Sequence, residues 1–559
     1  MIRSRLSVKC FQLLLATVVV SGVTAQESQS TARMGVPEDW THHHVIFTAD
    51  FLRAHPDIVA RDPRALHQIY RRWGKLFSTN VVDLSETARK EPSGDWNVQL
   101  GAGTTAFGTS PAKYQTDPTQ PPSCTTDFVV FGINAAGLQK VGNTNGQATV
   151  VAFNQLYTGP LGNGGICNHG PTYYFSYNTS TVTNGKIRTS PVISLDGTEI
   201  AFVESSANGS ALHVLKIGTT GDNGGTIPNN KSVVDPVIPG TGNNAKLTTI
   251  NYTTANNNHS SPWVDYSSDT LYVGDDNGTL YKVTGVFKGT PTLVSGGGWP
   301  VVIPGAFQLT GPVFDSTTGK VFAGDSRGFL HSVDATTPGT ITNLAVGKST
   351  SLNSTILDSP ILDSNGNVFA TSSNDGTSAV VVQADAATLT QKARVRIGEG
   401  SKSGTSVNLY DGDFDNNFYT SVNTGHYVLC STGANSISPY RYILSISGGL
   451  LQTDNSPVQI STSTSSRCGP LTEFFNPNIG GGTDYFFWGV SNNCVGASGC
   501  IMELANGTTV KTVAATNGTS AVIIDNDSAA SQASNIYFAT QGGTQATRLA
   551  TKVQQSTLQ

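Results

Sequence analysis

Three aspartates in the segment "DGDFDNN", residues 411–417, have the spacing of a metal-binding loop. Asp411, Asp413 and Asp415 occupy alternating positions, as the first oxygen ligands of a calcium loop do. The glutamate that completes a helix–loop–helix calcium site is absent downstream, and the flanking residues favour strands. The segment therefore predicts either a calcium site in a loop or a solvated turn between two strands.

Three consecutive histidines form a second group of metal-ligating side chains, in "DWTHHHVIF", residues 39–47. Neighbouring side chains of a strand point to opposite sides, so His42 and His44 would share one face. With a third ligand from elsewhere, this pair would suit Zn²⁺ or Cu²⁺. The alternative is a polar strand or an interfacial cluster.

A nucleophilic serine is the third candidate. The sequence "GDSRG", residues 324–328, fits G-x-S-x-G, but a nucleophile elbow needs a helix after the turn, and a strand-like segment follows here. We interpret "GDSRG" as a hairpin turn. Catalysis would instead be indicated if His169, His259, His426 or Asp411 converged on one channel with perturbed pKa values.

The elements that must position these residues come from a repeat. The segments "TLYVGDDNGTLYKV" (270–283) and "KVFAGDSRGFLHSV" (320–333) have the same strand–turn–strand pattern. Prolines open successive units at positions 191, 262, 312, 360 and 470. The last interval, 110 residues, is about twice the two before it, so a unit without a proline is expected between, where residues 406–432 scan as strand, turn, strand, turn, strand. Residues 127–153 and 521–553 predict two outer units.

Repeated antiparallel sheets of short strands favour one architecture. One such sheet cannot cover both of its faces, but sheets packed radially bury their faces on their neighbours. A unit of about 50 residues over 127–553 gives roughly eight repeats. The sequence predicts an all-β fold, a seven- or eight-bladed β-propeller with a short helical N-terminal segment; a β-sandwich or several small β-domains are the alternative.

The repeats also resemble a known group of propellers. "LYVGDDNGTLYKVTGVFKG" (271–289) and "VFAGDSRGFLHSVDATTPG" (321–339) are similar to the repeats of pyrroloquinoline-quinone-type propellers, and "SPVISLDGTEIAFVES" (190–205) resembles the TolB type. The likeness covers about three-quarters of the chain and implies a fold, not an activity. The tryptophan that quinoprotein dehydrogenases repeat and their adjacent cysteine pair are absent from the sequence, so the resemblance does not imply a bound quinone.

The N-terminal region differs in sequence pattern from the repeats. Arg3, Arg5 and Lys9 precede an apolar run over 11–20 and small residues over 23–25, which predicts a signal peptide cleaved near Ala25 and a secreted or periplasmic protein. Residues 1–25 are thus assigned to the signal peptide, 26–120 to an N-terminal extension and 121–559 to the propeller. No later apolar run reaches the length of a membrane-spanning helix.

Within the extension, a helix is expected around residues 62–78. Asp62 can cap it, and Pro63 suits its first position. Leu66, Ile69 and Tyr70, followed by Trp73 and Phe77, form one apolar stripe. The helix is expected to pack on the side or bottom of the propeller or to dock a partner.

Six cysteines follow the predicted cleavage site. An even number in an exported chain favours disulfides over metal sites. Proximity in the sequence favours Cys124–Cys167, Cys430–Cys468 and Cys494–Cys500, although six cysteines allow fifteen pairings.

Composition narrows the function. Charged residues make up 13% of the chain and the net charge is −5 with no basic block, so a nucleic-acid partner is not expected. We predict an exported, non-catalytic propeller that binds a protein, peptide or glycan through its loops or central channel. The alternative is an enzyme using the channel mouth, such as a quinone-dependent dehydrogenase, a lyase or a glycoside hydrolase. The sequence identifies no cofactor; calcium at Asp411, Asp413 and Asp415 is the candidate that it offers.

Overall fold

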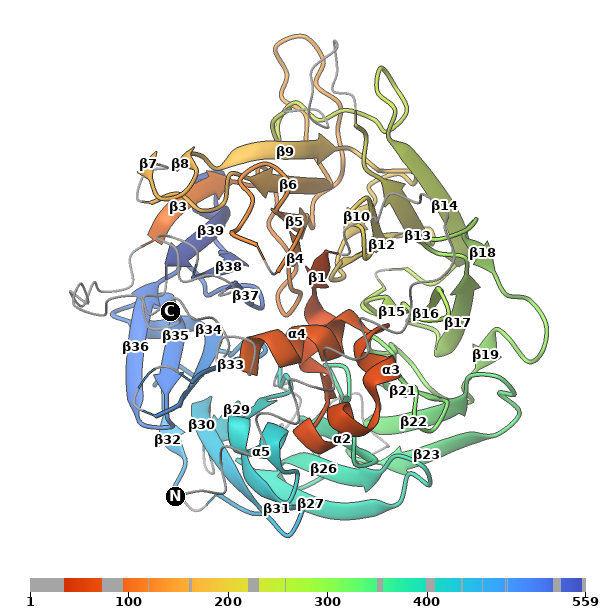
Figure 1. The fold of residues 1–559 in the computed structure, drawn as a ribbon, viewed down its shortest axis with the longest axis vertical. Helices are drawn as coiled ribbons and strands as arrows, with labels where there is room; N and C mark the ends of the chain where they lie inside the picture. The colour runs from red at the N-terminus through yellow and green to blue at the C-terminus, as the bar shows by residue number, and fades with distance from the viewer. Residues whose placement is uncertain are drawn as a thin grey trace, which may run out of the picture. The chain divides into compact units, whose positions relative to one another are not determined.

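The computed structural model describes residues 35–72, 94–118, 120–159, 163–219, 231–256, 258–348, 355–398, 408–433, 436–454, 456–477, 479, 481–525 and 534–554. Gly35–Gln559 form one compact unit. In it, eight sheets of four or five strands stand around a common axis (Figure 1). This confirms the predicted β-propeller and sets the number of blades at eight. The predicted signal peptide lies outside the described residues.

The first four blades contain these strands: β1 (Val36–Glu38), β4 (Ala112–Gln115), β5 (Phe128–Gly132), β6 (Val150–Asn154) and β9 (Thr172–Tyr177) in blade 1; β10 (Lys186–Ile187), β11 (Val192–Ile193), β12 (Glu199–Ser206), β13 (Gly209–Lys216) and β14 (Lys246–Thr253) in blade 2; β15 (Trp263–Asp265), β16 (Thr270–Gly274), β17 (Thr279–Thr284), β18 (Thr292–Leu293) and β19 (Val301–Val302) in blade 3; and β20 (Val313–Asp315), β21 (Lys320–Gly324), β22 (Phe329–Asp334) and β23 (Ile341–Ala345) in blade 4.

The other four blades contain these: β2 (Val45–Ile46), β24 (Ile361–Asp363), β25 (Asn367–Ser372), β26 (Ala379–Asp385) and β27 (Gln391–Ile397) in blade 5; β28 (Asp413–Phe414), β29 (Thr424–Gly433), β30 (Ser436–Ser447), β31 (Leu450–Leu451) and β32 (Val458–Gln459) in blade 6; β33 (Thr472–Asn476), β34 (Thr483–Val495), β35 (Ser498–Ala505) and β36 (Thr509–Ala514) in blade 7; and β37 (Ile523–Asp525), β38 (Asn535–Ala539), β39 (Leu549–Gln554) and β3 (Gly94–Gln99) in blade 8. Outside the blades lie β7 (Asn163–Gly164), β8 (Asn168–His169), the helices α2 (Ala49–Ala54), α3 (Pro56–Val59), α4 (Pro63–Arg72) and α5 (Asn416–Thr420), and the 3₁₀ turns η1 (Trp40–His43) and η6 (Gln545–Thr547).

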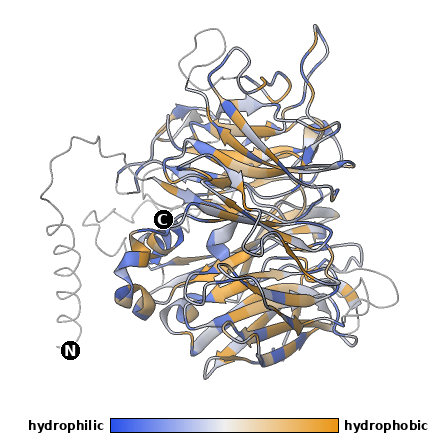
Figure 2. Ribbon diagram, turned by 90° about the vertical axis from the view of Figure 1, so that its right-hand side faces the viewer, coloured by the Kyte–Doolittle hydropathy of each residue, from blue (hydrophilic) through white to orange (hydrophobic). Residues whose placement is uncertain are grey.

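Neighbouring blades bury their apolar faces on one another. Phe175 of blade 1 and Phe202 of blade 2, for example, belong to one buried cluster. Figure 2 shows apolar residues concentrated in the strands of the blades. The burial of both faces of each sheet explains why the chain repeats the unit.

The repeated prolines stand where the sequence analysis places them. Pro191, Pro262, Pro312 and Pro360 directly precede β11, β15, β20 and β24. The start of a strand tolerates proline because its first residue need not donate to the ladder.

The "GDSRG" segment is a hairpin turn between β21 and β22. Asp325 Oδ1 accepts hydrogen bonds from the main-chain N–H of Arg327 at 3.0 Å and of Phe329 at 2.8 Å. Asp275 closes the turn of blade 3 through the same two positions, at 2.9 and 2.8 Å. The serine of this motif therefore belongs to a repeated structural turn, as predicted.

Blade 8 is closed by a strand from the N-terminal side of the chain. β3 pairs antiparallel with β39 from Gly94↔Val553 to Gln99↔Leu549. β4, also before residue 121, forms part of blade 1. The sheets of the propeller thus include residues that the sequence analysis assigns to the N-terminal extension.

One predicted strand of blade 6 is a helix instead. The middle of the segment 406–432 folds as α5, whose first turn is capped by the Asp415 side chain accepting from Phe418 N–H. The prediction of strand, turn, strand, turn, strand was wrong here because an aspartate cap selects a helical turn in preference to extension.

Helices α2–α4 lie over the centre of the ring (Figure 1). α4 begins at Pro63, and the Asp62 carboxylate accepts from Arg64 N–H at 2.9 Å, which confirms the expected start. Most of the buried residues of α4, however, are polar or charged. Leu66, Ile69 and Tyr70 are only partly buried, and of these Ile69 packs against the hydrophobic core. The helix thus packs on the propeller, the first of the two expectations, and does so mainly through polar and charged side chains. Trp73 and Phe77 lie outside the described residues.

Three disulfides join the cysteines as proximity predicts: Cys124–Cys167, Cys430–Cys468 and Cys494–Cys500. In the part of the chain that the structure describes, no helix combines the length and the apolar character needed to cross a membrane.

Candidate functional site

A short N-terminal segment, residues 36–46, crosses the axis of the propeller. β1 forms the edge of blade 1 by pairing with β4, and β2 forms the edge of blade 5 by pairing in parallel with β24. Blades 1 and 5 are opposite one another in a ring of eight, so η1 between these strands must span the channel. We call residues 36–46 the plug.

The plug is fixed by buried polar contacts. Trp40 Nε1 donates to the Pro262 carbonyl at 3.2 Å, and the Trp40 ring lies 5.8 Å from that of Trp263. Arg71 of α4 forms a buried ion pair with Glu38 of β1. The plug and α4 are thus held together against the blades.

A cavity of about 370 Å³ lies against the plug, which supplies Trp40, His43 and His44 to its lining. We call it the axial cavity. Every blade contributes residues, many of them from the links that precede β4, β11, β15, β20, β24, β28, β33 and β37: Ser110, Ser190, Ser261, Gly311, Ser359, Gly412, Leu471 and Ala521. No residue of α2–α4 is among those lining it. The cavity is therefore closed on one side by the plug.

The serines of these links connect one blade to the next. Ser110 N–H donates to Ser190 Oγ at 2.9 Å, and Ser190 N–H donates to Ser261 Oγ at 2.9 Å. Buried hydroxyl groups that accept such bonds are oriented by them. The wall of the axial cavity is therefore rigid between blades 1 and 3.

Two carboxyl groups from adjacent blades meet at the cavity. Asp411 N–H donates to Asp358 Oδ2 at 3.2 Å. The Asp358 side chain is 15% exposed and faces the cavity, whereas both oxygens of Asp411 are buried and have no hydrogen-bond partner among the described residues.

Burial sets the protonation of this pair. It raises the pKa of Asp358 to about 6, above the usual value. Burial, followed by the charge of Asp358, raises the pKa of Asp411 well above its ordinary value. Burial thus disfavours the charged form of both carboxyl groups, more strongly at Asp411, so Asp358 is the first of the pair to lose its proton.

The histidines of the plug take separate partners. His43 Nδ1 lies 3.3 Å from Asp413 Oδ2, and His44 Nε2 lies 3.9 Å from Asp358 Oδ1. Burial, then the charge of His43, lowers the pKa of His44 to about 4, so its imidazole is neutral at pH 7. His42 is turned away, with Nδ1 3.2 Å from the main-chain nitrogen of Asp39. His42 and His44 lie in and beside a 3₁₀ turn, not on one face of a strand.

The three alternating aspartates also separate. Asp411 belongs to the carboxyl pair, Asp413 Oδ2 accepts from Glu473 N–H at 2.8 Å, and Asp415 caps α5. Within the described ranges, no group of three or more His, Cys, Asp or Glu side chains is placed to hold a metal ion. Alternation in the sequence did not bring these carboxylates together because Asp415 lies beyond the two-residue strand β28, at the start of a helix.

Of the four residues whose convergence would indicate catalysis, two line the axial cavity: Asp411 and His259. The His259 ring is half-exposed and lies 3.2 Å from Asp276 Oδ2. His169 is exposed on the small hairpin β7–β8, and His426 Nδ1 lies 2.8 Å from Asp415 Oδ2, which raises the pKa of His426.

Sequence reasoning missed two residues of the site, Asp358 and Arg188. Both line the cavity, and Arg188 Nε is buried with no hydrogen-bond partner in the described part of the chain. They precede the repeated prolines by two and three positions, in "DSP" and "RTSP". Side chains two or three positions before these prolines line the axial cavity. The repeated prolines would therefore have pointed to Asp358 and Arg188.

Comparisons with known proteins support the fold alone. No protein-family model and no curated protein matches the sequence. Among solved structures, BamB from Moraxella catarrhalis is similar at 12% identity over 83% of this chain and 98% of that one, with a TM-score of 0.41. Saccharomyces cerevisiae Sqt1 is similar at 10% identity over 83% and 98%, with a TM-score of 0.49.

A quinohemoprotein alcohol dehydrogenase from Pseudomonas putida is similar at 14% identity over 46% of this chain and 42% of that one, with a TM-score of 0.32. Solved propellers of the quinoprotein type are thus among the similar structures, at low identity. This is a likeness of fold and assigns no activity.

Proposed function

We propose that the protein is an exported, non-catalytic β-propeller that binds a protein, peptide or glycan by taking a polar group of that ligand into the axial cavity. The observation that carries this proposal is the cavity itself, about 370 Å³ in volume, closed by the plug and lined by all eight blades. Ligand sites in proteins have volumes of roughly 300 to 1,000 Å³ and combine apolar walls with a few oriented polar groups.

The lining offers both kinds of surface. Trp40, Phe107 and Tyr410 supply aromatic area, while Asp358 and Arg188 supply one negative and one positive group. A ligand group with both donors and acceptors, such as a peptide link or a sugar ring, would complement this set. A purely apolar ligand would leave the charged groups without solvent or partner.

Binding is favoured over catalysis by the position of Asp411. Its oxygens are sealed from solvent, and a general acid must come within hydrogen-bond reach of the atom that it protonates. The raised pKa of Asp411 is therefore explained by its burial in the structure and does not indicate a general acid.

Acid–base catalysis in the same cavity, as in a lyase or glycoside hydrolase, is the second candidate. The observation in its favour is the pair Asp358 and Asp411, whose carboxyl groups differ in protonation. Release of 4-nitrophenol from a panel of 4-nitrophenyl glycosides tests it. Turnover that is abolished in Asp358→Asn would replace the binding proposal with an enzymatic one.

Export is the other part of the proposal. Three disulfides persist best in an oxidising compartment, and the predicted signal peptide agrees with such a location. N-terminal sequencing of protein from the culture medium or periplasm should find a mature chain that starts near Gln26. A chain that retains Met1 would count against export.

Blocking the axial cavity tests the binding proposal. Ala106 lines the cavity from a loop, and Ala102 is exposed on the same loop outside it. Oligosaccharide and peptide arrays probed with the wild type should give a ligand that Ala106→Trp no longer binds and Ala102→Trp still binds. A ligand that Ala106→Trp retains with unchanged affinity binds elsewhere, and the axial cavity would not be its site.

A further inference from the structure

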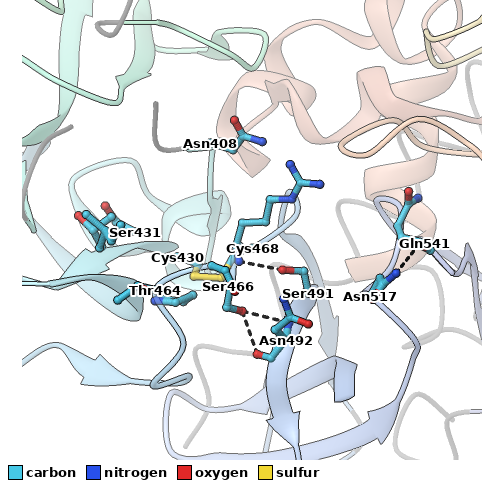
Figure 3. A pocket seen from close by; sticks show the side chains of 15 residues that line it. Asn408, Cys430, Ser431, Thr464, Ser466, Cys468, Ser491, Asn492, Asn517 and Gln541 are labelled. Atoms are coloured by element: carbon cyan, nitrogen blue, oxygen red, sulfur yellow. Dashed lines mark hydrogen bonds between the residues drawn. A yellow bond between two sulfur atoms is a disulfide. The ribbon is translucent and has the colours of Figure 1, made fainter. Parts of the chain in front are cut away.

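A second concavity lies between blades 6 and 7, and no residue of the plug lines it. It encloses about 480 Å³ and is lined by residues of β29, β30 and β34, the loop 464–468, Asn517 and Gln541. Figure 3 shows its side chains. We call it the blade 6–7 groove.

The chemistry of this groove is uniform. Of its 15 lining residues, six are Ser or Thr and four are Asn or Gln. None is an aspartate or glutamate, and the one charged residue is Arg467. A wall of hydroxyl and amide groups with a single cation matches a ligand with many hydroxyl groups and one negative charge.

Arg467 is available to such a ligand. It is exposed, and its guanidinium carbon lies 4.4 Å from the centre of the Phe107 ring. The main-chain N–H of Arg467 donates to Ser491 Oγ at 3.0 Å, but its guanidinium has no carboxylate or carbonyl partner among the described residues. Stacking on an aromatic ring holds a guanidinium plane while leaving its N–H groups free to bind a carboxylate in a bidentate manner.

The loop that carries Arg467 is fixed before any ligand arrives. The Cys430–Cys468 disulfide ties it to β29. Ser466 Oγ donates to the Asn492 carbonyl at 2.9 Å and accepts from Asn492 N–H at 3.1 Å (Figure 3). Little ordering is then needed on binding, which favours affinity for a small ligand.

Unused polar groups complete the groove. The side chains of Asn408, Thr464 and Asn492 line it and take part in no hydrogen bond within the described ranges. Asn408 also lines the axial cavity, as does Phe107, on which Arg467 stacks. Arg467 therefore stands where the groove meets the axial cavity.

From this chemistry we propose that the blade 6–7 groove is a binding site for an acidic saccharide, with the sugar carboxylate on Arg467 and the ring hydroxyls on the Ser, Thr and Asn side chains. An extended peptide is the less suitable ligand, because peptide grooves offer apolar pockets or an open strand edge, and Ile437 and Pro439 are the only aliphatic residues in this lining.

Isothermal titration with trigalacturonate tests the proposal. The wild type should bind trigalacturonate and bind maltotriose, a neutral trisaccharide, much more weakly. Arg467→Gln should weaken the binding of trigalacturonate about tenfold or more, the loss expected for a hydrogen-bonded ion pair. The thermal unfolding midpoint should not change, because Arg467 is exposed.

Arg327→Gln is the matched control. Arg327 stacks on Phe307 at 4.3 Å in blade 4 and lines neither the groove nor the axial cavity, so its loss should leave binding unchanged. A ligand that Ala106→Trp loses but Arg467→Gln still binds would belong to the axial cavity, which separates the two sites. Absence of binding by the wild type, or equal binding by Arg467→Gln, would overturn the proposal. Tighter binding of triserine, a peptide with a free carboxylate, would reassign the groove to peptides.

Discussion

At the scale of single residues, the buried carboxyl pair is the least expected feature of the axial cavity. Asp411 has no hydrogen-bond partner for either oxygen among the described residues, an arrangement that would be costly for an ionised group. A proton on Asp411 removes most of that cost, in agreement with the raised pKa. The negative charge of the pair then stays on Asp358, the member that faces the cavity.

Asp411→Asn should stabilise the protein at alkaline pH relative to the wild type. The folded-state pKa of Asp411 is raised, so the wild type is most stable below the unfolded-state value and loses stability as the pH rises toward the folded-state value. The loss approaches about 1.4 kcal/mol per pH unit while unfolding releases one proton. Asparagine does not titrate, so urea unfolding should show a difference near zero at pH 4 that grows toward pH 8.

Asp334→Asn is the control, because its effect on stability should depend on pH in the opposite direction. Main-chain hydrogen bonds from Thr337 and Thr336 lower the pKa of Asp334. Its contribution to stability is therefore present above the unfolded-state value and lost as the pH falls. Asp334→Asn should therefore lower the free energy of unfolding at neutral pH, and this difference from the wild type should vanish in acid. If Asp411→Asn followed this same course, Asp411 would be ionised in the folded protein.

At the scale of elements, α4 shows why a hydrophobic stripe can mislead. The surface under the helix is polar, since it presents Glu473, Asn416 and main-chain carbonyls. Arginine matches that surface, because its stem is apolar and its head donates several hydrogen bonds. Arg72 pairs with Glu473 and lies 3.3 Å from the centre of the Tyr419 ring, while Arg64 lies 4.0 Å from that of Trp263.

Arg72→Met should destabilise the protein far more than Leu66→Ser. Removing Arg72 leaves Glu473 buried without its cation, and breaking a buried pair in this way costs about 3–5 kcal/mol. Leu66 is only partly buried, and its loss should cost about 1 kcal/mol. Adding Glu473→Gln to Arg72→Met should restore part of the loss. Urea denaturation of the four proteins measures this, and equal effects of the two single changes would contradict docking through the charged face.

The disulfides differ in the length of chain that they close. Cys430 and Cys468 are 38 residues apart, and Cys494 and Cys500 are 6 apart. Loop-closure entropy predicts losses of about 4 kcal/mol for Cys430→Ser/Cys468→Ser and about 2 kcal/mol for Cys494→Ser/Cys500→Ser. The first variant should also weaken trigalacturonate binding, because the loop of Arg467 is released. Denaturation and titration of both variants measure these effects; a larger stability loss in the second would contradict the entropic account.

At the scale of the whole molecule, the sequence predicts the blades but neither the strand that closes the ring nor the plug that crosses it. Proline-led units with turns rich in Asp, Asn and Gly repeat, so the sequence predicts the type of blade and a count of seven or eight. The closing strand β3 lies more than 400 residues before its partner β39, and the plug pairs through two strands of two and three residues. Such short and distant pairings leave no periodic signal, and for this reason the axial cavity could be anticipated only as a channel.

Closure of the ring should depend on Trp96 of β3. Its side chain is 4% exposed; the ring lies 6.1 Å from Tyr537 of blade 8 and 6.0 Å from Phe153 of blade 1, and Nε1 donates to the Leu156 carbonyl at 3.3 Å. Trp96→Ala should cost about 3–5 kcal/mol. Because the contact joins the first blade to the last, hydrogen exchange should accelerate first in β39 and β6.

The matched control is Trp299→Ala, which removes a tryptophan of similar burial between blades 3 and 4, where its Nε1 donates to the Ala335 carbonyl at 3.3 Å. Exchange should then accelerate in β17 and β22 while β39 keeps its protection. If all contacts between neighbouring blades were equivalent, each substitution would accelerate hydrogen exchange to the same extent. Faster exchange spread evenly over all eight blades in Trp96→Ala would therefore show that β3 is an ordinary edge strand and not the point at which the propeller closes.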